Sequence, residues 1–351
     1  MSQTAFVTGS TGLLGNNLVR ALVGAGWKVK ALARDPAKAL QQFGGLSNVE
    51  IVIGNLLRIS SFESALSGSD VLFHAGAHFR DSYKGGNHWA ELKRVNVDGT
   101  HALLDAAYKA GVRKAVYTSS IAVLNGEPGV LIDETDSRDE AGADDYYRSK
   151  ILAERAVAAF LADRPDFDAC DVLPGWMWGP GDMGPTSAGQ VALDTVRGKL
   201  PGLVPGSFSV VDARDVAEAH IAAVTKGRRG ERYLAAGRHM DMQLLVPMIG
   251  RIAGVQTPTT KIPMTVLFGL AVVQETYARI TKKPVLVSLA TVKSMAEHVG
   301  RTHFNPAKST RELGLEFRPV ETTIADTIAW YRANGWLPPA DPQTIPLASA
   351  A

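Results

Sequence analysis

A tyrosine and a lysine four residues apart form the pattern in this sequence most typical of proton transfer. In the segment DDYYRSK, Tyr146 precedes Lys150 by four positions, so on a helix both side chains project from one face, and Tyr147 projects elsewhere. A phenol has an ordinary pKa near ~10, and a neighbouring ammonium group favours its ionised form, which suits acid–base work at neutral pH. The same spacing also fits a half-exposed aromatic residue beside a solvated lysine, so the interpretation depends on the rest of the chain.

A glycine-rich segment near the start of the chain predicts a site for a dinucleotide. Gly9, Gly12 and Gly15 lie in TGSTGLLG, a segment that follows a predicted strand at residues 5–8 and opens a predicted helix at residues 13–25. Glycine allows a tight turn and a close approach of backbone N–H groups to a pyrophosphate, which a helix N-terminus also favours. An ordinary strand-to-helix turn is the alternative, but the position and spacing favour dinucleotide binding.

The end of the second predicted strand bears on the choice of dinucleotide. An acidic residue there binds the 2′-hydroxyl of NAD, whereas a basic residue suits the 2′-phosphate of NADP. Both types are present, because Arg34 precedes Asp35 and Lys38 follows. The planar guanidinium of Arg34 fits a phosphate and Lys38 adds a second positive charge, so NADPH is the preferred cofactor and NADH the second choice. Solvated turn residues are the alternative interpretation of Arg34 and Asp35.

Composition limits the class of protein. The chain has 351 residues, 46% of them hydrophobic, which is enough for a large core and a second lobe. Its 37 basic and 35 acidic residues leave a formal charge of +2, so no basic face for a nucleic-acid backbone is expected. The single cysteine, Cys170, excludes an internal disulfide framework and, without an apolar run after a charged N-terminus, favours a reducing cytoplasm and an inert core thiol.

Neither a membrane span nor a metal site is predicted. The longest apolar stretch, around residues 266–273, falls short of the ~20 residues that cross a bilayer and predicts a packed helix. His74 and His78 are four residues apart, but they straddle a predicted strand end, where that spacing does not bring them together. Metal catalysis is therefore disfavoured.

Short apolar runs alternate with amphipathic stretches through the first half of the chain. Strands are predicted at residues 5–8, 29–33, 49–53, 71–74, 115–118 and 169–173, with helices between them, notably at 13–25, 95–110 and 146–162. Strands separated by helices form a parallel sheet with right-handed crossovers. The predicted fold class is α/β, a Rossmann-type doubly wound parallel sheet with a smaller, mostly helical C-terminal substrate lobe.

The composition changes at Pro174, where Gly, Pro, Trp and Met crowd into the segment PGWMWGPGD. A strand-and-helix pair at residues 209–224 is expected to re-enter the sheet domain. The dinucleotide-binding domain then spans residues 1–174 and about 208–235, and the substrate-binding lobe spans about 175–207 and 236–340. Residues 341–351 are predicted to form a flexible tail.

These motifs together resemble the extended short-chain dehydrogenase/reductase family, within the NAD-dependent epimerase/dehydratase superfamily. The glycine loop, VLFHAGA at residues 71–77, Asn96 in VNVDG, TSS at 118–120, the Tyr146 and Lys150 pair, residues 174–182 and Asp215 in DARDVAEA occur in the expected order across nearly the whole chain. The segment VKALARDP is most similar to the dihydroflavonol reductase branch, which includes bacterial aldehyde and ketone reductases and prefers NADPH.

The resemblance implies a role for several of these residues. Tyr146 is the expected general acid, Lys150 is expected to hold the nicotinamide ribose and lower the pKa of the phenol, and Ser120 is expected to bind the substrate oxygen. Ser119 is one residue away from that role. Asn55 stands where the family usually has Asp, and its amide oxygen can still accept from the adenine amine. The other cofactor contacts that the resemblance implies are Thr8, Thr11, Leu13, Leu14, Leu56, Ala75, Gly76, Ala77, Thr118, Pro174, Gly175, Trp176 and Met177.

Two further family positions are expected to have supporting roles. For Asn96, a structural or water-holding role competes with a role at the entry of a helix. Asp215 is expected to be structural rather than catalytic.

The expected reaction is hydride transfer from the nicotinamide to a carbonyl carbon, while Tyr146 protonates the oxygen and Ser120 stabilises the developing charge. The substrate is a small carbonyl or alcohol compound. By resemblance, the pocket or its rim contains Ser120 with His78, Phe79, Trp176, Met177, Trp178, Met183 and Phe208. Apart from Ser120, these side chains suggest an apolar or aromatic substrate, although each also fits ordinary packing of the lobe.

Alternative functions remain open at this point. A nucleotide-sugar epimerase or dehydratase uses the same scaffold with a tightly bound NAD, and Arg232 or Arg301 would then hold a diphosphate, although Arg34 argues against NAD. Oxidation of the 3β-hydroxysteroid dehydrogenase type and a redox-sensing protein without catalysis are two others. By resemblance, the helices that begin near residues 95 and 146 pair into a homodimer, with Leu152, Val157 and Leu161 as apolar candidates, and a monomer is the alternative.

Overall fold

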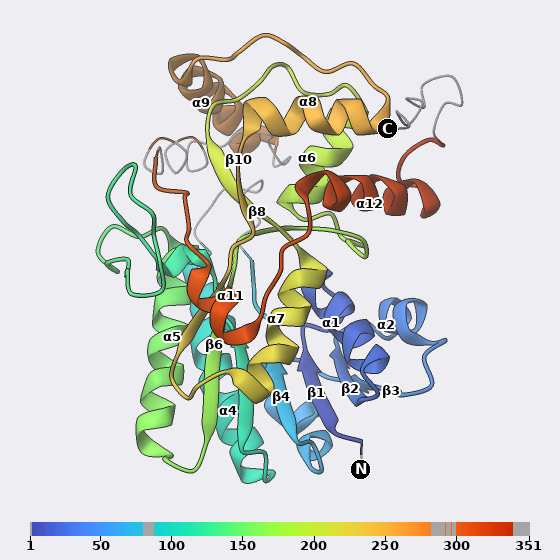
Figure 1. Cartoon of the computed structure of the whole chain (residues 1–351), viewed down its shortest axis with the longest axis vertical. Helices are drawn as coiled ribbons and strands as arrows, with labels where there is room; N and C mark the ends of the chain where they lie inside the picture. Colours follow the sequence, from blue (N-terminus) through green and yellow to red (C-terminus); the bar gives the residue numbers. More distant parts are fainter. Residues whose placement is uncertain (1, 80–87, 282–291, 293–295, 297–299, 340–351) are drawn as a thin grey trace.

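The structure, a computed structural model, describes residues 2–79, 88–281, 292, 296 and 300–339. Within these residues, seven parallel strands form the central sheet in the order β3-β2-β1-β4-β5-β6-β9 (Figure 1). They are β1 (Thr4–Thr8), β2 (Lys28–Ala33), β3 (Val49–Ile53), β4 (Val71–His74), β5 (Lys114–Thr118), β6 (Asp168–Pro174) and β9 (Arg232–Ala235). The Rossmann-type sheet is confirmed, and its first six strands match the predicted ones to within one residue at each end.

Helices cover both faces of this sheet (Figure 1). One face packs against α1 (Leu13–Gly24), α2 (Pro36–Phe43), α7 (Ala213–Lys226) and α11 (Ala307–Leu313). The other face packs against α4 (Gly99–Lys109) and α5 (Asp145–Asp163). Because both faces are covered, strand β4 is buried along its whole length, as apolar strands of parallel sheets are. Each face therefore has its own apolar core.

The helix predicted at residues 95–110 starts earlier and is less regular than expected. It begins as α3 (Trp89–Leu92), continues as a π-helical segment (Lys93–Asp98) and ends as α4. A π-helical segment inserts an extra residue into the helical ladder and often occurs at functional sites. Asn96 lies inside this segment, so the expected role at a helix entry is wrong.

Helix α5 bears on the predicted homodimer. Val157 is 2% exposed and Leu161 is 5% exposed, and both pack into the core between α5 and the sheet. These two side chains therefore face the interior, and only Leu152 is half-buried among the three apolar candidates. The homodimer itself stays a prediction.

A second, smaller sheet lies beyond the carboxyl ends of the central strands (Figure 1). It contains β7 (Trp176–Trp178), β8 (Ser207–Asp212) and β10 (Arg238–Asp241), with β8 in the middle, parallel to β7 and antiparallel to β10. Helices α6 (Ser187–Val196), α8 (Met242–Ala253), α9 (Met264–Thr281) and α12 (Val320–Ala333) accompany it. One apolar core joins this sheet to α6, α8 and α12.

The strand-and-helix pair expected to re-enter the sheet domain does so only through its helix. Helix α7 packs against α1 on the central sheet, but strand β8 belongs to the small sheet, so the strand half of that prediction is wrong. The strand that extends the central sheet is β9, which pairs with β6 from Arg232 to Ala235. At four residues, β9 is too short to show a clear periodicity in the sequence.

The apolar stretch around residues 266–273 is helical, in α9, but packs on one side only. Leu267 and Ala271 are buried, whereas Val266, Val272 and Val273 are 55%, 50% and 65% exposed. Among the described residues, no helix combines the length and the apolar composition that a membrane span requires. The predicted tail at 341–351 lies outside the described residues.

Candidate active site

The predicted proton-transfer residues meet where β5 ends and α5 begins. Asp144 caps α5, and its side chain accepts from the backbone N–H groups of Tyr146 and Tyr147 at 2.8 and 3.0 Å. The cap fixes the first turn, which carries Tyr146, and Lys150 follows one turn later. Ser120 follows β5, and its hydroxyl is hydrogen-bonded to the Tyr146 phenol. The structure therefore brings the serine and the tyrosine together.

The electrostatics of the phenol differ from the expectation. Burial raises the pKa of Tyr146 above its ordinary value, and the hydrogen bond with Ser120 opposes this shift only in part. The expected lowering of this pKa is wrong here, because burial outweighs the opposing contribution. Nζ of Lys150 donates to the carbonyl oxygen of Thr118, at 2.9 Å. The phenol is therefore protonated across the physiological pH range, which suits a proton donor.

Lys150 is buried as well, at 3% exposure. Burial lowers its pKa from 10.5 to about 8, while the negative charges of Glu154 and Asp171 oppose that shift. The ammonium group is therefore close to losing its proton near neutral pH.

The glycine loop has the shape that a dinucleotide requires. Gly9 has φ +66°, and a Cβ there would lie 2.6 Å from the carbonyl oxygen of Ala75, so only glycine fits. A Cβ on Gly15 would collide with the backbone of Gly9, which explains how closely α1 approaches β1. Gly12 is the N-cap of α1 and has no side chain to bond the N–H groups of the first turn. These donors and the helix N-terminus fit a pyrophosphate.

The other predicted cofactor contacts of the glycine loop differ in how deeply their side chains are buried. Thr11 is half-buried and its carbonyl oxygen accepts from Gln42 at 3.3 Å. Leu13 and Leu14 are each 6% exposed, so their side chains pack in the core and only their backbone faces the loop.

The carboxyl ends of β1 and β4 are joined by a chain of buried hydrogen bonds. The Thr8 hydroxyl oxygen lies 2.8 Å from Nδ1 of His74 and accepts from the backbone N–H of Gly76 at 3.0 Å. Nε2 of His74 lies 2.9 Å from the hydroxyl oxygen of Thr100, and burial lowers the pKa of His74 to about 3, so the ring is neutral. Leu56 lies against Gly76. This is the point where the strand order reverses, the usual dinucleotide crevice of such sheets.

The residues expected to select the cofactor lie on or before α2. Asp35 caps this helix, and its carboxylate accepts from the backbone N–H groups of Ala37 and Lys38 at 2.9 and 3.2 Å. Arg34 is exposed and Lys38 is half-buried. The side-chain oxygen of Asn55 accepts from the N–H of Leu57, at 3.0 Å, so it shapes its own turn.

Residues 5–236 match the profile of the NAD dependent epimerase/dehydratase family. This chain belongs to that family. It is an NAD(P)-dependent oxidoreductase of the extended short-chain dehydrogenase/reductase group, as its motifs implied.

Similar proteins span nearly the whole chain. Sterol demethylase protein B of Methylococcus capsulatus is 34% identical over 338 residues, which are 95% of this chain and 100% of that protein. A putative dihydroflavonol 4-reductase of Synechocystis is 31% identical over 345 residues, 96% and 97% of the two chains. Among solved structures, that of gox2253 has a TM-score of 0.81 at 32% identity and covers 96% of this chain and 100% of its own.

Two polar residues of the extended short-chain dehydrogenase/reductase pattern have structural roles here. The Asn96 side chain accepts from the backbone N–H of His78 at 2.7 Å and donates to the carbonyl oxygen of His78 and to the Ser149 hydroxyl at 2.9 and 3.0 Å. It thus ties the loop after β4 to α5. Asp215 accepts from the backbone N–H and the guanidinium of Arg318, which supports its expected structural role.

Several predicted pocket residues lie near the Tyr146 phenol or in the smaller lobe. The Phe79 ring contacts the Tyr146 ring edge to face, with 4.8 Å between centroids, and it is 56% exposed. Trp176 is half-buried, its ring contacts the tilted ring of Phe208 with 4.6 Å between centroids, and its indole N–H donates to the Ser187 hydroxyl. Ala77 and His78 precede Phe79 on the same segment, Met183 is half-buried in the loop after β7, and Thr118 ends β5 beneath Lys150.

Strand β7 divides its residues between two sides. Successive side chains of a strand point to opposite faces, so Trp176 and Trp178 share a face and Met177 lies on the other. Met177 packs against the core of α1 and α7, whereas Trp178 is 1% exposed in the lobe core. Trp178 is therefore a core residue, and its prediction as a pocket residue is wrong. Before β7, Pro174 is buried, and a Cβ on Gly175 would lie 2.5 Å from the Ala236 carbonyl oxygen.

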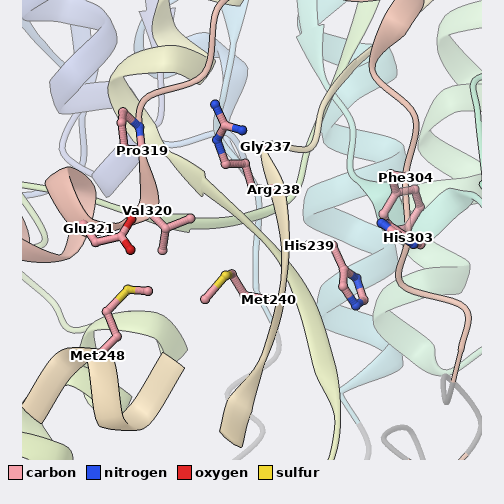
Figure 2. Close-up of a pocket in the computed structure, with 10 residues that line it drawn as sticks. All are labelled: Gly237, Arg238, His239, Met240, Met248, His303, Phe304, Pro319, Val320 and Glu321. Atoms are coloured by element: carbon pink, nitrogen blue, oxygen red, sulfur yellow. The ribbon is translucent and has the colours of Figure 1, made fainter. Parts of the chain in front are cut away.

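A separate cavity lies away from these residues. It has a volume of about 570 Å³ and lies beside β10, between α8 and the start of α12 (Figure 2). Met240 and Met248 lie on one side of it and the rings of His239 and His303 on the other. None of its lining residues is among the predicted site residues. Among the described residues, no group of three or more His, Cys, Asp or Glu side chains has an arrangement that holds a metal ion.

The sequence analysis, which named Arg232 only as a candidate diphosphate ligand, did not predict that three polar residues lie behind Lys150. They are Glu154, Asp171 and Arg232, which reach the same region from α5, β6 and β9. Glu154 lies four residues after Lys150, so the i, i+4 rule that paired Tyr146 with Lys150 extends to it. No local signal marks the other two, because their proximity depends on the order of the strands.

Proposed function

We propose that this oxidoreductase reduces an aldehyde or ketone to the alcohol with NADPH. One observation carries the proposal: the Tyr146 phenol is hydrogen-bonded to Ser120 and protonated at neutral pH, because burial raises its pKa. A group in that state is ready to donate a proton, as reduction requires, and not to remove one. NADPH, when bound, supplies the hydride.

The other two residues support that transfer. The Ser120 hydroxyl lies beside the phenol, so both O–H groups can donate to one carbonyl oxygen and stabilise its developing negative charge. As Tyr146 loses its proton, the buried site acquires a phenolate, and the Lys150 ammonium one helical turn away stabilises that charge. The same ammonium group, which donates to the Thr118 carbonyl oxygen, would bind the ribose hydroxyls of the cofactor.

The preference for NADPH is supported by the local roles of the two charged residues after β2. The Asp35 carboxylate is engaged by the first turn of α2. Arg34 is exposed, and Lys38 adds a second cation on the same segment. This arrangement favours the 2′-phosphate over the 2′-hydroxyl.

An apolar substrate is favoured by the aromatic contact at the phenol and by the relatives. The exposed Phe79 ring beside Tyr146 presents an apolar surface at the site of proton transfer. The similar proteins have names that refer to a sterol and to a dihydroflavonol, both fused-ring compounds. We therefore expect a bulky, largely apolar carbonyl compound.

The main alternative, a nucleotide-sugar epimerase or dehydratase, loses one of its two candidate diphosphate ligands. Arg232 is 19% exposed, and its guanidinium donates to the carbonyl oxygens of Glu134 and Asp136 and lies beside Glu154. The Arg232 guanidinium is thus occupied by groups of the protein itself, which argues against its binding a diphosphate.

A substrate panel followed at the NADPH absorbance tests the proposal. It contains aromatic aldehydes, ketoesters, steroid ketones and flavonoids, with sugar nucleotides run in parallel. We expect one NADPH oxidised for each alcohol formed from an apolar carbonyl compound, and no conversion of sugar nucleotides. Conversion of a sugar nucleotide without net change in absorbance would establish the alternative.

A further inference from the structure

A row of polar side chains crosses the central sheet beneath the first half of α5. In the parallel register, Tyr117 on β5 is opposite Asp171 on β6, and Asp171 is opposite Arg232 on β9. Residues directly opposite each other in a sheet point to the same face. Lys150 and Glu154, four residues apart on α5, project toward this row from above.

The contacts between the helix and the row are close. Nζ of Lys150 lies 5.4 Å from the centroid of the Tyr117 ring. One carboxylate oxygen of Glu154 accepts from the Ser119 hydroxyl at 2.5 Å, and the other is 3.5 Å from the Arg232 guanidinium. The Glu154 side chain is 13% exposed. Such burial of charge costs free energy unless the groups compensate each other.

The two acids differ in the partners that stabilise a negative charge. Burial, as the largest cause, raises the pKa of both Glu154 and Asp171, and the charge of Glu154 raises that of Asp171 further. The hydrogen bond from Ser119 and the nearby Arg232 stabilise the carboxylate of Glu154. Asp171 is buried, at 8% exposure, and yet one of its carboxylate oxygens has no hydrogen-bond partner among the described residues. Glu154 therefore has partners that hold a negative charge in place, whereas one oxygen of Asp171 has none among the described residues.

We propose that Glu154, with Asp171 behind it, is a positioning residue that keeps Lys150 charged and directed at the active site. A buried ammonium group without a counter-charge would release its proton and could no longer stabilise the phenolate. Glu154 supplies that counter-charge from one helical turn away, on the side opposite to Tyr146. The consequence for turnover rests on the proposed function, whereas the charge state of Lys150 does not.

The other titratable groups around Lys150 cannot replace Glu154. His74 on β4 is neutral, because burial lowers its pKa to about 3. Tyr117 and Tyr146 keep their protons, because burial raises the pKa of each. Arg232 is a cation and adds to the positive charge. The negative charges that act on Lys150 among the described residues come from Glu154 and Asp171.

Titration of Lys150 by NMR in protein labelled with ¹³Cε-lysine tests the proposal, with the resonance assigned from Lys150→Arg. We expect a midpoint near pH 8 in the wild-type protein, and a midpoint lower by about one pH unit in Glu154→Gln, since one lost charge shifts a buried pKa by about that much. Glu154→Asp retains the charge and should restore most of the difference. Because burial raises the pKa of Asp171 well above its ordinary value, Asp171→Asn should shift the midpoint less than Glu154→Gln does.

Two results would overturn the proposal. One is an unchanged Lys150 midpoint in folded Glu154→Gln, and the other is a larger shift in Asp171→Asn than in Glu154→Gln. Val157→Ala, one turn further along α5, is the matched control, because it removes packing without removing charge and should leave the midpoint in place. Titration needs no substrate, so a protein that reduces no carbonyl compound but shows the shift would refute the proposed function and keep the role of Glu154.

Discussion

The two halves of α5 contact the same sheet with different kinds of side chain, apolar in the second half and charged in the first. The second half packs Val157, Phe160 and Leu161 into an apolar core, where each large side chain contributes about 1.5–3 kcal/mol by burial. The first half places Lys150 and Glu154 over a polar row, where burial raises the free energy of every charged group. The difference indicates that the apolar contacts of the second half fix α5 on the sheet. This fixed position keeps the Lys150 ammonium group of the first half in an environment where its charge is unfavourable.

Truncation in the apolar half is expected to give the largest loss of stability. Phe160 is 4% exposed and meets the Phe167 ring edge to face, with 5.2 Å between centroids. Phe160→Ala should lower the free energy of unfolding by about 3–5 kcal/mol, measured by urea denaturation, with no dependence on pH between 6 and 9. Ala158→Ser, at an exposed position of the same helix, is the control. A loss below about 1 kcal/mol would mean that this half does not anchor α5.

Removal of the charge in the polar half should have the opposite effect on stability. Burial lowers the pKa of Lys150 from 10.5 to about 8, so the charged form opposes folding by about 3 kcal/mol. The native state loses this proton first, so the penalty is full below pH 8 and disappears as the pH rises toward 10.5. Lys150→Met should therefore be more stable than the wild-type protein at pH 7, with the difference shrinking above pH 8. Equal stability of the two proteins at pH 7 would contradict the claim that the buried charge of Lys150 opposes folding.

A substitution remote from α5 should affect neither half. Arg34→Ala is expected to raise the KM for NADPH about tenfold, to leave the KM for NADH unchanged and to preserve the unfolding free energy, because Arg34 is exposed. Arg58→Ala, also exposed, is the matched control. An unchanged ratio of the two KM values would remove Arg34 from cofactor selection.

The sequence predicted those parts of the fold whose signals are local and continuous. Strands such as β4 are buried on both faces and appear as unbroken apolar runs. Strands β7, β9 and β10 have three or four residues each, too few for a periodicity, and so they were missed. The π-helical turn around Asn96 has no distinct composition, because its residues also fit a regular helix.

The candidate site also contains features that have a local sequence signal and features that have none. The glycine loop and the spacing of Tyr146 and Lys150 are local patterns, and the structure has the loop after β1 and the pair in the first turns of α5, as predicted. The direction of the Tyr146 pKa shift depends on burial by remote segments, which no spacing reveals. The core position of Trp178 was accessible in principle, because strand alternation separates it from Met177 once a strand is recognised there.

The central claim is that Tyr146 donates the proton that accompanies hydride transfer from NADPH. Single-turnover oxidation of bound NADPH by an accepted carbonyl substrate, compared between Tyr146→Phe and Tyr147→Phe, tests it most directly. We expect the rate to fall by about 10²–10⁴-fold in Tyr146→Phe, with NADPH still bound, and to stay near the wild-type value in Tyr147→Phe. Wild-type turnover in Tyr146→Phe with NADPH bound would contradict the claim.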